Sequence, residues 1–296
     1  MTTTRRQRGN RVGTAFLALV FLFFYVPILS VMAYSFNESP VAGTWTQFSL
    51  RWYARLGDDP ELLDAAWTSL VLGLFTAFAS VFIGAWIGFV LASYRRFAGQ
   101  GLFTAMINAP MVLPEVISGI SLLLLFVGME QLTGWPPGRG MVTMWIGHVM
   151  LCISYVAITV RARLSAIDPS LLEAARDLGA TPLRVFFDIT LPLIAGALVS
   201  GWLLSLTISL DDVIMSAFLA GPDTTTLPLV VLSRIRLGLD PTINALGTLF
   251  IVFVSLIVVG NSYVVMKREQ RQARSLQMAL RGELSGGDAH RPVPDT

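Results

Sequence analysis

The chain has 296 residues and a net charge of +2, and 54% of its residues are hydrophobic whereas only 14% are charged. Soluble globular domains carry about 25% charged residues, so the composition argues against a soluble protein and indicates a membrane protein. A net charge this small does not indicate nucleic-acid binding, and we expect no nucleic-acid partner.

Long stretches without charged side chains mark five candidate transmembrane helices. Each stretch has the ~18–20 apolar residues that a helix needs to cross a bilayer. Lipid offers the backbone no hydrogen-bond partners, so the stretches must be helical, and their continuous apolar character excludes barrel strands. The predicted spans cover about residues 12–36, 66–93, 141–161, 192–220 and 243–266.

A sixth span is predicted over about 102–128, where Pro110, Pro114 and Glu115 interrupt an apolar stretch. Because the uncharged part after Glu115 is too short to cross alone, we expect one kinked helix with Glu115 near mid-membrane. Proline is tolerated in membrane helices when neighbouring groups satisfy the freed backbone. The predicted fold class is therefore all-α, a polytopic membrane protein with six transmembrane helices.

The basic residues set the expected orientation. Sixteen of the 21 Lys and Arg residues fall on one side of the predicted spans and five on the other. The positive-inside rule then places both termini in the cytoplasm. We expect a basic N-terminus over 1–11, a transmembrane domain over 12–266 and a basic, partly disordered tail over 267–296. The first apolar stretch is long for a signal peptide and has no convincing cleavage site, so we interpret it as a retained helix.

Enzymatic motifs are not found in the sequence. Its single lysine, Lys267, follows no glycine-rich loop, so the chain has no P-loop for ATP hydrolysis, and its histidines form no HExxH motif. His148, inside a predicted span, is expected to be hydrogen-bonded within the helix bundle, with a proton relay as the alternative. We therefore expect that the chain is not an enzyme.

The cytoplasmic segment over 166–192 has the features of a compact helical hairpin. Asp168 suits a helix N-cap with Pro169 at the first helical position, and Gly179 suits a left-handed helix end. Thr181 and the proline after it start a second short helix, which leads to the fifth span at Pro192. Small residues within the hairpin permit close approach of another chain.

This segment resembles the "EAA" loop of permease subunits of binding-protein-dependent ABC importers. The residues that carry the resemblance are Glu173, Ala174, Ala175, Gly179 and Pro192. In that family the loop between helices 4 and 5 contains the coupling helix, which docks on the ATPase subunit. The resemblance implies a bacterial inner-membrane protein with no cofactor of its own, since ATP and Mg²⁺ bind to the partner ATPase. It also implies three partners: a second permease, expected to be homologous rather than identical, an ATPase dimer and a periplasmic substrate-binding protein.

Shorter segments are similar to the spermidine/putrescine branch of this family. They cover residues 209–213, 226–228 and 241–245. The resemblance implies a polyamine importer that works by alternating access, with a putrescine system as the closest match.

Three acidic residues lie in or near the predicted spans, namely Glu115, Asp211 and Asp212. Acids within a membrane are costly and usually face a polar interior, so they are candidates for a cation pathway. Adjacent helical residues point ~100° apart, so Asp211 and Asp212 do not both face a pore, and one of them is expected to cap a helix break or pair with the partner subunit. Glu115 is alternatively a hydrogen-bonding group at the proline kink. Trp202 is a candidate for cation–π contact with an amine, or else a packing residue.

Three alternatives remain open at this point. An ABC permease for a different solute fits the same loop. An ion-coupled carrier or channel fits the acids but leaves the 166–192 segment without a role. An intramembrane enzyme would need a nucleophile and base or a metal cluster within the spans.

Overall fold

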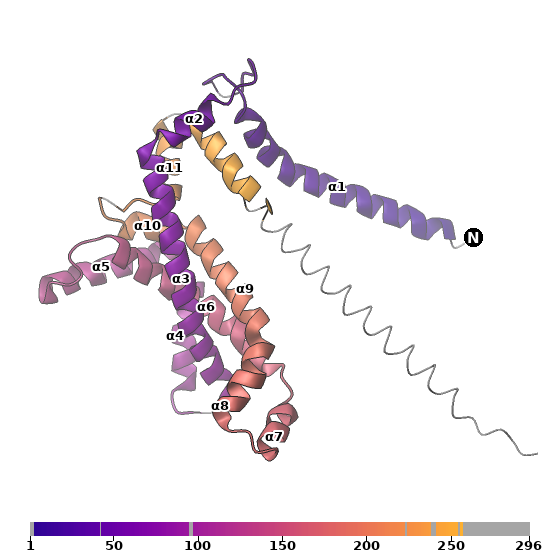
Figure 1. The fold of residues 1–296 in the computed structure, drawn as a ribbon, viewed down its shortest axis with the longest axis vertical. Helices are drawn as coiled ribbons and strands as arrows, with labels where there is room; N and C mark the ends of the chain where they lie inside the picture. Colours follow the sequence, from indigo (N-terminus) through magenta and orange to yellow (C-terminus); the bar gives the residue numbers. More distant parts are fainter. Residues whose placement is uncertain are drawn as a thin grey trace, which may run out of the picture. The chain divides into compact units, whose positions relative to one another are not determined.

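In the computed structural model, the described residues are helical apart from turns, irregular segments and one isolated antiparallel bridge between Asn37 and Phe48. It divides into two compact units, one formed by residues 1–56 with 240–296 and the other by residues 57–239 (Figure 1). The predicted tail over 267–296 lies outside the described residues. The structure describes residues 3–41, 43–94, 97–222, 224–237, 241–253 and 255–256.

The first unit contains α1 (Thr3–Tyr34), α2 (Arg51–Gly57) and an apolar helix over Pro241–Phe253. The buried Trp52 anchors α2, because its indole Nε1 donates a 2.7 Å hydrogen bond to the carbonyl oxygen of Asn37. A Cβ placed on Gly247 would lie 3.6 Å from Val31, which shows that the Pro241–Phe253 helix contacts α1.

Three long helices form the centre of the second unit: α3 (Pro60–Ser93), α6 (Met141–Ser165) and α9 (Leu191–Asp211). Gly84 and Gly88 on α3 are four residues apart and face α6. A Cβ on Gly84 would lie 2.7 Å from Cβ of Val156, and one on Gly88 would lie 2.8 Å from the carbonyl oxygen of Ala157. Small residues at this spacing let two membrane helices approach closely, where lipid provides no hydrophobic drive for association.

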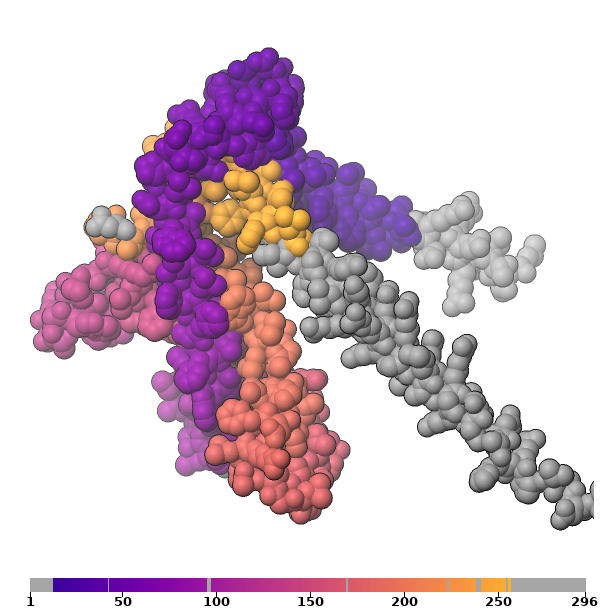
Figure 2. Space-filling model, in the orientation of Figure 1, coloured from indigo at the N-terminus to yellow at the C-terminus, as the bar shows by residue number. Residues whose placement is uncertain are grey.

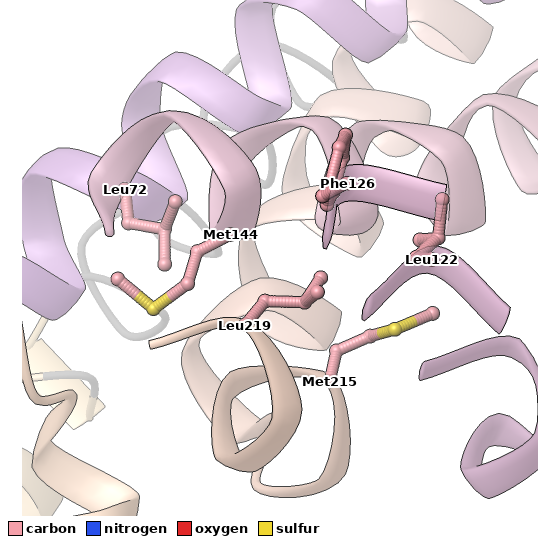
Figure 3. Packing of buried hydrophobic residues seen from close by; sticks show 6 residues of the cluster. All are labelled: Leu72, Leu122, Phe126, Met144, Met215 and Leu219. Atoms are coloured by element: carbon pink, nitrogen blue, oxygen red, sulfur yellow. The ribbon is translucent and has the colours of Figure 1, made fainter. Parts of the chain in front are cut away.

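Shorter helices surround this centre. They are α4 (Gln100–Val112), α5 (Glu115–Thr133), α10 (Ile214–Leu219) and α11 (Leu227–Leu237). Side chains from α3, α5, α6 and α10 point toward one another in one apolar cluster (Figure 3). The cluster consists of Leu72, Leu122, Phe126, Met144, Met215 and Leu219. It places α10 among helices that lie far from it in sequence.

Five helices within the described residues are long and apolar enough to cross a membrane, which confirms the all-α membrane class. They cover Gly13–Tyr34, Pro60–Ser93, Glu115–Thr133, Met141–Ser165 and Pro182–Asp211. The predicted sixth span over 243–266 is described only in its first part, as the shorter helix Pro241–Phe253.

Two predicted spans are wrong in their details. The expected kinked helix over 102–128 is two helices, α4 and α5, because Leu113 is extended (φ −73°, ψ 137°) before Pro114. Glu115 therefore begins α5 instead of lying inside a span. The expected helix over 192–220 also breaks, because Asp212 is extended (φ −68°, ψ 128°) between α9 and α10.

Candidate functional site

The 166–192 segment begins with α7 (Pro169–Asp177), which starts as the sequence predicts. Asp168 is the N-cap, and its carboxylate accepts a 3.0 Å hydrogen bond from the amide of Ser170. This backbone bond, followed by the bond from the Ser170 side chain, holds the pKa of Asp168 below its usual range. The cap satisfies an amide that has no partner within the helix.

Helix α7 ends in a left-handed turn at Gly179, whose φ is +84°. The amide of Gly179 donates to the carbonyl oxygen of Arg176 at 2.8 Å, and the amide of Ala180 donates to that of Ala175 at 3.1 Å. These two bonds form a Schellman motif, which satisfies the last carbonyls of a helix and requires a positive φ that glycine adopts without strain. The prediction that Gly179 stops the helix is confirmed.

The outer surface of this segment is open to solvent at one end of the second unit (Figure 2). Glu173 and Ala174 are exposed and Ala175 is partly buried. Leu178 is 90% exposed and Leu183, on α8 (Pro182–Val185), is 72% exposed. Exposed leucines beside small residues form an apolar surface of the kind that binds another protein.

Pro192 lies in the first turn of α9. The hairpin joins α9 without a break, through α8 and one π-helical turn, η1 (Phe186–Thr190). In that turn the amide of Leu191 donates to the carbonyl oxygen of Phe186. Because Pro192 has no amide hydrogen, it interrupts the usual bonding pattern at the point where this turn passes into the membrane helix.

Asp212 lies in a buried polar cluster at the break between α9 and α10. Its carboxylate accepts hydrogen bonds from the amides of Met215 (3.1 Å) and Ser216 (2.8 Å) and from the hydroxyl of Ser216 (2.9 Å). Nε2 of His148, on α6, lies 3.2 Å from the same carboxylate, and the two side chains are 1% and 4% exposed. Nδ1 of His148 lies 2.7 Å from the hydroxyl of Ser209. Asp212 thus caps the start of α10, and His148 is hydrogen-bonded within the bundle, as predicted.

The other two acids have different surroundings. Asp211 is the last residue of α9, and Glu115 is in the first turn of α5; both side chains are exposed. Within the part of the chain that the structure describes, no hydrogen bond or ion pair joins Glu115, Asp211 and Asp212 to one another. The three acids therefore differ: the carboxylate of Asp212 is buried and hydrogen-bonded within the fold, whereas those of Asp211 and Glu115 are exposed on the surface of the chain.

Trp202 packs against Phe78 of α3, with ring centroids 5.6 Å apart at an angle of 60°. Its indole nitrogen is buried and has no hydrogen-bond partner among the described residues. This edge-on contact is typical of aromatic packing between helices.

A charged cluster ties α11 to the start of α3. The guanidinium of Arg234 donates to both carboxylate oxygens of Asp59 (2.6 and 2.9 Å) and to Glu61 (2.6 Å). The hydrogen bonds that Arg234 donates to Asp59 raise the pKa of Arg234 further above its usual value. Asp59 also caps α3 by accepting from the amide of Leu62 at 3.2 Å. The carboxylate of Asp59 thus caps α3 and also holds α11.

Replacing Arg234 by lysine is expected to weaken this attachment. Lysine keeps the charge but not the planar fork that binds a carboxylate through two bonds. We expect the thermal unfolding temperature of the detergent-purified transporter to fall by the equivalent of about 1 kcal/mol. An equal change at Arg236, whose side chain is exposed, should leave it unaltered. Equal effects at the two positions would contradict a specific role for Arg234.

Sequence reasoning missed Ser209, Ser216 and the partners of Arg234. Ser209 and Ser216 are short polar side chains in an apolar stretch, which usually bond to the preceding turn of their own helix. The signal available in the sequence was the spacing of the polar residues. Ser209 lies three residues before Asp212 and Ser216 lies four residues after it, so their hydroxyls can come close to its carboxylate. Only the fold shows that His148, more than 60 residues earlier in the sequence, completes the cluster.

Residues 80–269 match the family model described as "Binding-protein-dependent transport system inner membrane component". The chain is 45% identical to the putrescine transport system permease protein PotI of Escherichia coli K12, over 90% of this chain and 95% of that protein. It is 34% identical to the spermidine/putrescine transport system permease protein PotC of the same strain, over 86% of this chain and 94% of that protein.

Solved structures share the fold at low sequence identity. A chain from a bacterial ABC transporter involved in import of the polysaccharide alginate matches with a TM-score of 0.65 and 20% identity, covering 90% of this chain and 98% of that one. A chain from the MetNI methionine ABC transporter, in an inward-facing conformation, matches with a TM-score of 0.53 and 19% identity, covering 69% of this chain and 94% of that one. The common feature is the transmembrane fold.

Proposed function

This chain belongs to the family of binding-protein-dependent transport system inner membrane components, and we propose that it is the permease subunit of an ATP-driven importer of putrescine or spermidine. The observation that carries the substrate class is the 45% identity, over nearly the full length of both chains, with a putrescine permease. The outward-facing carboxylate of Asp211 is chemically suited to such a substrate, because polyamines are cations at neutral pH.

We infer that the chain acts with partners on both sides of the membrane. A second, homologous permease would complete the pathway, an ATPase dimer would bind ATP and Mg²⁺ in the cytoplasm, and a periplasmic protein would deliver the substrate. The basic side of the topology, which includes both termini, would face the cytoplasm. The 166–192 segment would then be on the side of the ATPase.

The exposed surface of the 166–192 segment supports docking on the ATPase. Glu173, Ala174 and Ala175 form one turn of α7, and the left-handed turn at Gly179 sets the direction of the chain toward α8. Since α8, η1 and α9 continue without a break to Pro192 and beyond, a displacement of the docked hairpin would be transmitted along α9 into the membrane. Alternating access would follow from this movement.

The buried and exposed acids support different roles. Asp212 has bonding partners within the fold, so a passing cation would have to displace them. Asp211 is exposed at the end of α9 and has no ion-pair partner among the described residues. We therefore assign cation contact to Asp211, with Glu115 as a second outward-facing acid. Trp202, which packs against Phe78, is better suited to holding α9 on α3 than to contacting an amine.

Uptake of radiolabelled putrescine and spermidine tests the proposal directly. The chain is expressed with its neighbouring transport genes in cells that lack their own polyamine uptake, and the control lacks the ATPase gene. We expect saturable uptake of at least one polyamine that depends on the ATPase. ATP-independent uptake would indicate a channel or ion-coupled carrier instead. If the complete set of subunits imports neither amine, the substrate class is wrong and an importer of another solute remains.

A further inference from the structure

A cavity of about 570 Å³ lies on the inner side of the 166–192 segment. Its walls come from the last turns of α3 and α6, from α7, and from the stretch from α8 to η1. All of these elements belong to the second unit. None of the exposed residues proposed to dock on the ATPase is among its lining residues, and neither the proposed cation pathway nor the apolar cluster in Figure 3 uses it.

Part of the cavity wall is apolar. Phe89 of α3 and Phe186 of η1 contact each other there edge to face, with ring centroids 5.8 Å apart. Leu164 of α6, Ile167 of the turn between α6 and α7, and Leu172 of α7 add aliphatic side chains. A small soluble anion would leave this apolar surface uncovered, whereas an acyl chain or glycerol backbone would bury it favourably.

The polar lining carries a positive charge. Arg176, on the last turn of α7, lines the cavity, and it has no ion-pair partner among the described residues. The hydroxyl-bearing residues Ser93, Ser165 and Thr190 line the same cavity. A guanidinium with neighbouring hydroxyls is well suited to binding a phosphate group.

The cavity also lies where a lipid headgroup would be. Ser93 and Ser165 end the two membrane helices α3 and α6 on the side that carries most of the basic residues. That side is cytoplasmic by the positive-inside rule, and the cytoplasmic leaflet carries anionic lipids that basic pockets between membrane helices recognise.

We propose that this cavity binds one anionic phospholipid of the cytoplasmic leaflet, with its phosphate at Arg176 and its apolar part against Phe89 and Phe186. The lipid would fill the space between the hairpin and the membrane helices. It would thereby connect the 166–192 segment to α3 as well as to α9. The proposal does not depend on which solute is transported.

Native mass spectrometry of the complete transporter tests the proposal. The complex is extracted into detergent after reconstitution in mixed phosphatidylglycerol and phosphatidylcholine, and retained lipids are counted. We expect wild-type protein to retain phosphatidylglycerol in preference to phosphatidylcholine. Arg176→Gln should reduce that preference about fivefold, since one basic residue near a membrane surface contributes about 1 kcal/mol. Ala92→Phe, which fills the cavity from α3, should reduce retention of both lipids.

The matched control is Arg184→Gln. Arg176 and Arg184 are both exposed residues of the same hairpin, but Arg184 pairs with Asp188 at 3.2 Å and does not line the cavity, so its replacement should leave lipid retention unchanged. Equal losses for Arg176→Gln and Arg184→Gln would mean diffuse charge attraction and would overturn the proposal. Displacement of the lipid by millimolar glycerol 3-phosphate would indicate a soluble phosphate site instead. No retained lipid in the complete complex would mean that another occupant, such as an ATPase side chain, fills the cavity.

Discussion

Substituting valine for Gly179 is expected to reduce polyamine uptake about tenfold while the subunit still inserts into the membrane. The φ of +84° at this position costs an L-amino acid about 1–2 kcal/mol, and about 1.4 kcal/mol corresponds to a factor of ten. The two hydrogen bonds to Ala175 and Arg176 would be lost with the turn. Uptake of labelled putrescine and co-purification of the ATPase are the measurements.

Graded substitutions separate the backbone effect from a surface effect. Asparagine tolerates the left-handed region better than other residues with a Cβ, so Gly179→Asn should retain more uptake than Gly179→Ala or Gly179→Val. Gly179→Asp has similar backbone tolerance but adds a charge to the exposed surface, and it should lose ATPase binding if that surface docks. Gly101→Val is the control, because Gly101 is helical and a Cβ added there would meet no atom within 4 Å. Normal uptake by Gly179→Val would show that the turn is not required.

The helical hairpin could be predicted from sequence because its signals are local. Asp168, Pro169 and Gly179 act on groups within four residues of themselves, so the cap and the left-handed turn follow from residue type and spacing. The long apolar spans were predictable for a similar reason, since lipid leaves the backbone no alternative to the helix.

The two helix breaks were harder to predict for different reasons. At Leu113 the signal was local but was given too little weight. The residue before a proline disfavours the helical region, and two prolines four residues apart favour a full break over the predicted kink. At Asp212 the cause is tertiary. The buried carboxylate bonds both to the amides that start α10 and to His148 on α6, and only the folded arrangement brings these groups together.

The Asp212 cluster should therefore matter for stability before it matters for transport. Removing a buried hydrogen-bond acceptor usually costs about 1–3 kcal/mol for each buried donor that is left without a partner. In Asp212→Ala the imidazole of His148 and three donors lose their acceptor. Reduced uptake in such a variant would reflect less folded protein, so it would not by itself identify a residue that contacts substrate.

Asp211→Asn is expected to give the opposite result, with normal stability and uptake reduced about tenfold. Asp211 is exposed and has no ion-pair partner among the described residues, so the fold loses little when its charge is removed. A transported dication would lose a charge-assisted contact, which is typically worth about 1.5–3 kcal/mol. The measurements are initial uptake rates over a range of putrescine concentrations and the thermal unfolding temperature of the purified complex.

The control for Asp211→Asn is Thr207→Val, one turn earlier on α9. Thr207 is also exposed, and its hydroxyl donates to the carbonyl oxygen of Leu203 at 2.8 Å. Because threonine is uncharged, Thr207→Val removes a polar group from α9 but no charge. Of the two variants at exposed positions, only Asp211→Asn should lose uptake, and neither should lower the unfolding temperature. Asp212→Ala should lower the unfolding temperature, and any loss of uptake in it should follow the loss of folded protein. If Asp211→Asn imports putrescine at the wild-type rate, Asp211 does not contact the cation, and the acids that do must lie elsewhere, at Glu115 or on the partner permease.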